Sequence, residues 1–236
     1  MMRSIFSVDN PVFKFISRIG DMFILSLLWL VTSIPVFTLG ASTTALYYNT
    51  IKIVRGRDSS LVKNYFKAFK SNFKDSTIIF FIMLFGGAVV LSYLYYWAQS
   101  KEQIAFVMNA LGLGVALMYF ATLLFVFPVL AVFENKINDT LRTAFLMAIR
   151  HWKVSFVLVV CSFGISYVCY RIPIVAYIML MIGSAILALI FSVQFVTVFR
   201  QYNPELAPDP EIEKPKEEKK KEPHHLRRVR AGKVIK

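Results

Sequence analysis

Residues 22–48 read MFILSLLWLVTSIPVFTLGASTTALYY, and this stretch decides the class of the fold. The part before Pro35 is apolar enough for a membrane-spanning helix, and no Asp, Glu, Lys or Arg occurs within the stretch. A proline interrupts a helix because it lacks an N–H and its ring collides with the preceding turn. We therefore predict a first span over about residues 22–39, followed by a segment rich in Gly, Ser and Thr.

Four more apolar blocks follow, and they indicate a polytopic membrane protein. Hydrophobic residues make up 57% of the 236-residue chain, and they occur in blocks instead of at amphipathic spacing. The predicted fold is an all-α membrane helix bundle of about five transmembrane helices joined by amphipathic cytoplasmic helices. The spans are expected at about residues 22–39, 77–97, 104–133, 154–170 and 174–199.

The cation-rich segments between the spans predict amphipathic helices at the membrane surface. Residues 42–56 and 59–76 are expected to form two interfacial helices, and residues 134–153 a further amphipathic stretch. The 59–76 segment places aromatic residues on one face and lysines on the others, which is typical of a helix lying on an anionic leaflet. The alternative is a cytoplasmic connector whose aromatic face packs on the bundle.

Residues 203–236 differ in composition from the rest of the chain. They are rich in Pro, Lys and Glu and contain no Phe, Tyr or Trp. Such a segment buries too little apolar surface to offset the entropy of ordering. We predict a disordered basic cytoplasmic tail there, which leaves residues 1–202 as the integral membrane domain.

The distribution of Lys and Arg predicts the orientation in the plasma membrane. Residues 40–76, 134–153 and 200–236 hold 22 of the 27 cationic residues, and such segments stay in the cytoplasm. The C-terminus is then cytoplasmic, and five spans place the N-terminus outside. A re-entrant hairpin over residues 22–48, broken at Pro35, is the alternative that leaves both ends in the cytoplasm. Because the net charge of +13 follows this membrane pattern, nucleic acid is not an expected partner.

The chain offers little catalytic chemistry. It contains no HExxH, GxSxG or Walker motif, and the predicted spans hold almost no ionisable residues. Glu134 and His151 could exchange a proton only if a third polar group met them in one cleft, and plain interfacial charge is the simpler interpretation. We therefore predict that the protein is not an enzyme and uses no metal and no cofactor.

The segment after Pro35 is the candidate binding site. Gly40 permits a turn, Ser42 or Thr43 can cap the following helix, and free N–H groups at a helix start favour anions or hydroxylated ligands. Two tyrosines add flat faces suited to sugars. The competing interpretation is capping and close packing after the proline break. The residues predicted to contact a ligand or partner are Thr38, Gly40, Ser42, Thr43, Thr44, Tyr47 and Tyr48.

Two blocks of the sequence resemble a known family. Residues 6–48, FSVDNPVFKFISRIGDMFILSLLWLVTSIPVFTLGASTTALYY, resemble the amino-terminal signature of the YesL-like family of bacterial integral membrane proteins. KNYFKAFKSNFKDS, residues 63–76, resembles the second block of that family, and the likeness extends over about residues 5–199. The resemblance implies a small polytopic plasma-membrane protein, often encoded near carbohydrate ABC importers and two-component sensors. It supplies no catalytic residues.

These observations lead to one expected function and one alternative. We expect a non-enzymatic accessory to carbohydrate uptake by an ABC importer, or to its sensing, that contacts a permease or a sensor kinase through its helices. The link to carbohydrate comes from the resemblance alone. The alternative is a small transporter or channel, for which a continuous polar cavity would be the distinguishing feature. Anionic lipids of the inner leaflet are expected partners, and the oligomeric state stays open.

Overall fold

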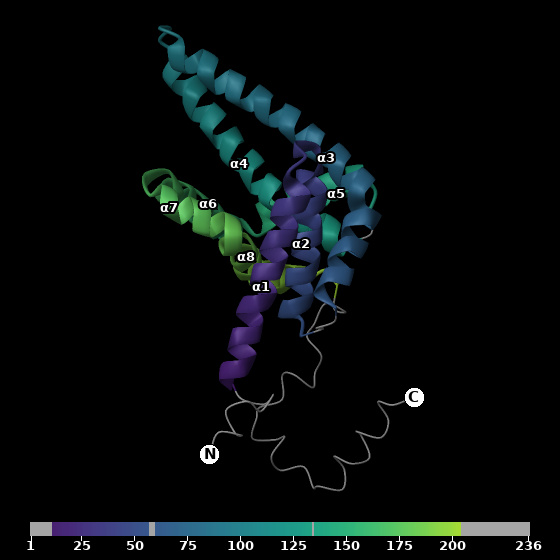
Figure 1. Ribbon diagram of the computed structural model, residues 1–236. Helices are drawn as coiled ribbons and strands as arrows, with labels where there is room; N and C mark the ends of the chain where they lie inside the picture. The colour runs from purple at the N-terminus through teal and green to yellow at the C-terminus, as the bar shows by residue number, and fades with distance from the viewer. Residues whose placement is uncertain (1–10, 57–59, 134, 204–236) are drawn as a thin grey trace, which may run out of the picture.

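The computed structural model describes residues 11–56, 60–133 and 135–203, which form a packed hub with two helical arms (Figure 1). In chain order the elements are α1 (Pro11–Ser33), η2 (Val36–Thr38), α2 (Leu39–Val54), α3 (Leu61–Gln99), α4 (Ala105–Val132), α5 (Ile137–Arg150), α6 (Trp152–Arg171), α7 (Pro173–Ile178), the π-helix η3 (Met179–Gly183) and α8 (Ser184–Phe199). No strand occurs in these ranges. The predicted tail lies outside the described residues except for Asn203.

Four helical segments of the described chain are long and apolar enough to cross a membrane. They are Leu61–Gln99, Ala105–Val132, Trp152–Arg171 and Pro173–Phe199. The prediction of a polytopic all-α membrane protein is confirmed by these segments. Each of the predicted second to fifth spans lies inside one of these segments, except that the predicted span 104–133 extends one residue beyond Ala105–Val132 at each end.

The region of the predicted first span is a helical hairpin instead of one helix over residues 22–39. Helix α1 ends at Ser33, and the turn η2 follows a Pro35 in extended backbone conformation. The physical reason is local, because proline donates no N–H and disfavours helical geometry in the residue before it. Figure 1 shows α2 running back beside α1, so that the start of α1 and the end of α2 lie at the same end of the hub.

Helix α2 is the buried centre of the hub and not the interfacial helix predicted over residues 42–56. Eleven of its 16 residues are buried, and it packs against α1, α3, α4 and α8. Small residues such as Gly40, Ala41 and Ala45 allow this close approach. The Thr50 and Ser192 hydroxyls, both fully buried, are 2.7 Å apart and join α2 to α8. The buried hydroxyl groups of Thr50 and Ser192 are thereby satisfied by each other.

Helix α3 joins two predicted elements into one. The amphipathic segment 59–76 and the span 77–97 were expected as separate helices, but residues 61–99 form a single 39-residue helix. No Pro or Gly lies between Leu61 and Phe85, so nothing in the sequence ends the helix there. The lysines of its first half are exposed, and its second half forms the first arm together with α4.

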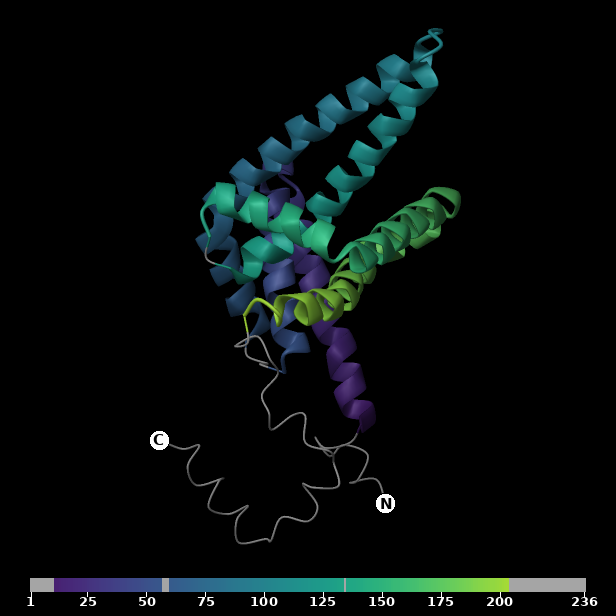
Figure 2. The ribbon, with the colours of Figure 1, turned by 180° about the vertical axis from the view of Figure 1, so that it is seen from behind.

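The second arm consists of α6 and the first part of the segment Pro173–Phe199, which turn back on each other at Ile172 (Figure 2), and the last part of α8 packs in the hub. Both views show the two arms leaving the hub in different directions. The apolar core lies in the hub, where Phe125, Phe195 and Phe199 are fully buried. The arms instead expose large apolar side chains, with Phe106 at 83% and Tyr170 at 84% exposure. Such surfaces suit the hydrocarbon of a bilayer.

Candidate functional site

The hydroxyl groups of the predicted site form hydrogen bonds within the hub. The Thr38 hydroxyl donates to the carbonyl oxygens of Thr32 and Pro35, at 2.5 and 2.6 Å. Ser42 donates to Thr38 O at 3.0 Å, and Thr44 donates to Gly40 O at 2.8 Å. In this geometry the hydroxyls stabilise the joint between η2 and α2.

The predicted capping of α2 by Ser42 or Thr43 does not occur. Helix α2 begins at Leu39, so both residues lie inside its first turns, and no side chain caps the helix. The Thr43 hydroxyl instead accepts a hydrogen bond from the indole N–H of Trp29 at 3.3 Å. This bond connects the two helices of the hairpin.

Gly40 lies where α2 meets α3 most closely. A Cβ atom at this position would be 2.5 Å from the carbonyl oxygen of Ser76 and 3.0 Å from Cβ of Phe80. The Tyr65 hydroxyl of α3 lies 2.7 Å from the Thr32 hydroxyl and donates to Ser42 O at 3.4 Å. The hairpin is thereby held against the first half of α3.

The two predicted tyrosines have different surroundings. Tyr47 is buried, with its ring edge-on to Phe195 at a centroid distance of 5.7 Å. Tyr48 is half-buried and lines a polar cavity of about 480 Å³, and the Lys52 ammonium lies 4.7 Å from the centroid of its ring. Tyr48 is therefore the predicted site residue that reaches a cavity.

This cavity and a neighbouring one lie side by side on α3. The first is bounded by Tyr48 of α2, by α3 and by the end of α4 with Phe133 and Asn135. Its polar lining residues are Lys67, Ser71, Asn72, Asp75 and Asn135, and its apolar ones are Ala68, Leu130, Ala131, Val132 and Phe133. The second, of about 520 Å³, is lined by Asp75, Ile78, Ile82, Lys136, Ile137 and Asn138. Asp75 borders both. We call the combined feature the α3 groove.

Sequence reasoning missed the α3 groove because the charged residues of 59–76 were assigned to the membrane surface. A usable signal was present in the spacing of Lys67, Ser71 and Asp75, which recur every four residues and form one polar stripe on a helix. Their partner Lys136 is far away in the sequence. Only packing of α5 beside α3 brings it to the groove.

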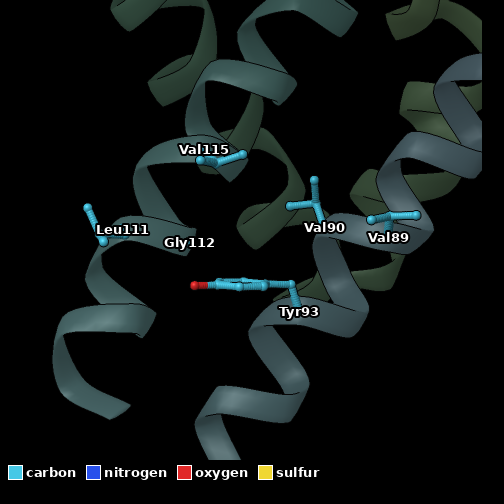
Figure 3. Close-up of a pocket in the computed structure, with 6 residues that line it drawn as sticks. All are labelled: Val89, Val90, Tyr93, Leu111, Gly112 and Val115. Atoms are coloured by element: carbon cyan, nitrogen blue, oxygen red, sulfur yellow. The ribbon is translucent and has the colours of Figure 1, made fainter. Parts of the chain in front are cut away.

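A third cavity, of about 350 Å³, lies within the first arm between α3 and α4 (Figure 3). Its lining consists of Val89, Val90, Tyr93, Leu111, Gly112 and Val115. Contacts between a tyrosine and a glycine hold the helices together there. The Tyr93 ring lies over Gly112, where a Cβ would be 2.6 Å from the ring, and Tyr119 packs against Gly86 and Gly87.

The residues considered for proton transfer do not form a described catalytic site. Glu134 lies outside the described residues. His151 Nε2 lies 3.2 Å from the Tyr202 hydroxyl, and burial, with a smaller effect of the Arg150 charge, lowers the pKa of His151. Over the described ranges, no three His, Cys, Asp or Glu side chains come together as metal ligands.

Two comparisons place the chain among known sequences. The family described as "Protein of unknown function, DUF624" matches residues 22–93, which include most of the α1–α2 hairpin and most of α3. The chain is 23% identical over 198 residues to "Uncharacterized protein YesL" of Bacillus subtilis (strain 168), which covers 82% of this chain and 92% of that protein. No solved structure gave a significant match.

Proposed function

We propose that this chain, a YesL-like membrane protein, is a non-enzymatic accessory that binds a membrane permease or sensor kinase through its two arms. The observation that carries the proposal is the contrast between a densely packed hub and arms whose outer faces are apolar and exposed. A helix that leaves most of its surface to lipid can exchange lipid contacts for contacts with another membrane helix.

The outer face of α4 supports helix association. Helix α4 contains two pairs of small residues spaced four apart, Ala110 with Gly114 and Gly112 with Ala116. Gly112 is buried against Tyr93 and Leu94, whereas a Cβ atom added at Gly114 would meet no neighbouring atom within 4 Å. Ala110, four residues earlier, is exposed on the same side. A small-xxx-small surface of this kind lets a second helix approach closely.

The cavities favour an accessory over a transporter or channel. A transport pathway requires polar groups that connect the two sides of the membrane. The cavity in the first arm has an apolar lining, and it shares no lining residue with the α3 groove of the hub. The proposed link to carbohydrate uptake or sensing is supported by the resemblance to the YesL-like family.

We further propose that the hub faces the cytoplasm and that both chain ends lie on that side of the plasma membrane. The α1–α2 hairpin brings the start of α1 to the same end of the hub as the end of α2, which supports the re-entrant alternative over an outside N-terminus. Among the Lys and Arg residues that the structure describes, all but Lys101 and Arg171 then lie on the hub side, and these two lie at the arm tips. The exposed lysines of α3 would contact the anionic inner leaflet.

Photo-crosslinking in intact membranes tests the accessory role. A photoreactive residue at Gly114, on the open face of the arm, should crosslink to an ABC permease or a sensor kinase, whereas one at Lys70, exposed on the hub, should not. Sugar uptake or the transcriptional response to sugar should also fall in a deletion strain. The absence of a permease or kinase adduct, together with normal uptake and response, would rule the proposal out.

A further inference from the structure

The α3 side of the groove changes from polar to apolar along the helix. Lys67, Ser71 and Asn72 border the first part, opposite the apolar end of α4, and Ile78 and Ile82 border the second part, together with Lys136 and Asn138. The two isoleucines of α3 are exposed at 38% and 44%. A molecule that fills both parts must itself be polar at one end and apolar at the other.

The position of the groove on α3 matches the boundary between lipid headgroups and acyl chains. Asp75 is the last charged residue of α3, and residues 76–99 contain none. The polar part of the groove therefore lies on the charged half of the helix, and Ile78 and Ile82 lie on the half that enters the hydrocarbon. A bilayer lipid meets these two environments in the same order.

The charged groups are arranged to bind a phosphate and a donor group in succession. Lys136 lies beside Ile78 and Ile82 in the apolar part, at the N-cap of α5, where the helix dipole adds to its positive charge. Asn72 uses its amide N–H groups on Ala68 O and the Ser71 hydroxyl, at 3.0 and 3.2 Å, so it offers an acceptor oxygen. Asp75 offers a carboxylate between these two positions.

We propose that the α3 groove binds one phospholipid of the leaflet at the hub side. The phosphate contacts Lys136, the headgroup places an N–H or O–H donor at Asp75 and Asn72, and an acyl chain lies along Ile78 and Ile82. Phosphatidylethanolamine and phosphatidylglycerol both carry such a donor after the phosphate. Phosphatidylcholine carries the same phosphate but no N–H or O–H, so it is the matched control lipid.

Native mass spectrometry of the full chain, with each lipid added separately at equal concentration, tests this inference. Phosphatidylethanolamine or phosphatidylglycerol should bind about tenfold more tightly than phosphatidylcholine, as expected for one hydrogen bond to a charged group. Equal binding of phosphatidylcholine would refute the proposal. Displacement of bound lipid by glycerophosphoethanolamine, which has no acyl chains, would show that a soluble phosphate compound is the true ligand and would also refute it.

Variants distinguish the groove from general lipid binding. Asp75→Asn should reduce the preference for phosphatidylethanolamine and phosphatidylglycerol over phosphatidylcholine about tenfold. Asp139→Asn, at an exposed residue outside the groove lining, should leave this preference unchanged. Lys136→Gln should weaken all three lipids, whereas Lys70→Gln should not. If Asp75→Asn does not fold, Ile82→Trp at the exposed apolar end should lower binding of all three lipids. Equal effects of groove and control variants would contradict the proposal.

Discussion

At the scale of single residues, Gly40 determines how closely two helices of the hub approach. The carbonyl oxygen of Ser76 occupies the direction in which a side chain at this position would extend. Any larger residue must push α2 away from α3 along a contact that also includes the Tyr65 hydroxyl and Ser42. The absence of a side chain is therefore a structural requirement.

Gly40→Ala should lower the stability of the protein in detergent by about 1–3 kcal/mol, because the added methyl group would overlap the Ser76 carbonyl oxygen and force the backbones of α2 and α3 apart. Gly114→Ala is the matched control, since nothing lies near the added methyl group and alanine is the better helix former. The control should melt at the same or a higher temperature than the wild type. A Gly40→Ala protein as stable as the wild type would show that the α2–α3 contact can adapt.

His151 should make the end of α8 sensitive to acid. Burial and the nearby Arg150 charge lower the pKa of His151 in the folded protein below its ordinary value of 6.5. As the pH falls through 6.5 the unfolded chain takes up the proton first, so the folded state loses stability on acidification. The contact affected is the one between His151 and Tyr202.

Melting temperatures at pH 7.5 and pH 5.5 test this prediction. The wild type should lose more stability between the two values than His151→Gln, which cannot take up a proton in this range. The difference between the two proteins in lost stability should be small, because the His151 side chain is only partly buried. Identical pH dependence of the two proteins would show that His151 does not contribute.

At the scale of elements, the π-helix η3 connects the second arm to the hub. A π-helical turn shifts the register of backbone hydrogen bonding within a helix. The fully buried Ser26 hydroxyl of α1 donates to Ile182 O at 2.9 Å and accepts from Ala185 N–H at 3.1 Å, where the π-helix changes back to α8. One side chain thus links α1 to the irregular part of the membrane helix.

Ser26→Ala should destabilise the protein by about 1–3 kcal/mol, since it leaves two buried backbone groups without this hydroxyl. Ser162→Ala is a suitable control because the Ser162 hydroxyl bonds only to Leu158 O of its own helix. Thermal unfolding of both variants in the same detergent measures the difference. Equal losses of stability in both variants would show that the Ser26 hydrogen bonds contribute no more than the bond of Ser162 within its own helix.

At the scale of the whole molecule, the proposed topology has an even number of membrane crossings. The start of α1, the end of α2, the start of α3 and the end of α8 lie at the hub, and the turns at 100–104 and 172 lie at the arm tips. This arrangement accounts for the charge distribution without the exception that an outside N-terminus requires.

Cysteine labelling in intact cells tests the arrangement, with Cys161 and Cys169 first replaced by serine. A cysteine at Ser4 should be protected from a membrane-impermeant thiol reagent and should react only after cell lysis. A cysteine at Gln103, in the turn at the first arm tip, should react in intact cells. Labelling of the Ser4 position from outside would restore five full spans and reject the hairpin topology.

The sequence by itself determined the class of the protein, the positions of four long apolar helices and the break at Pro35. Apolar blocks of sufficient length are membrane helices in almost any context, because each satisfies its own backbone hydrogen bonds. The backbone effect of Pro35 is equally local. Among the predicted site residues, Tyr48 lines a cavity, while Thr38, Ser42, Thr43 and Thr44 form hydrogen bonds within the hub.

Only the tertiary structure decided that α2 is the centre of the hub and that α3 carries a groove. Thr50 and Ser192 are 142 residues apart, and Asp75 of α3 lines the groove with Lys136, which precedes α5, so neither proximity leaves a local pattern in the sequence. A helix with Gly, Ser, Thr and Asn residues is equally suited to a surface and to a crowded interior. Which of the two it occupies depends on the shape and hydrogen-bonding groups of α1, α3, α4 and α8 around it.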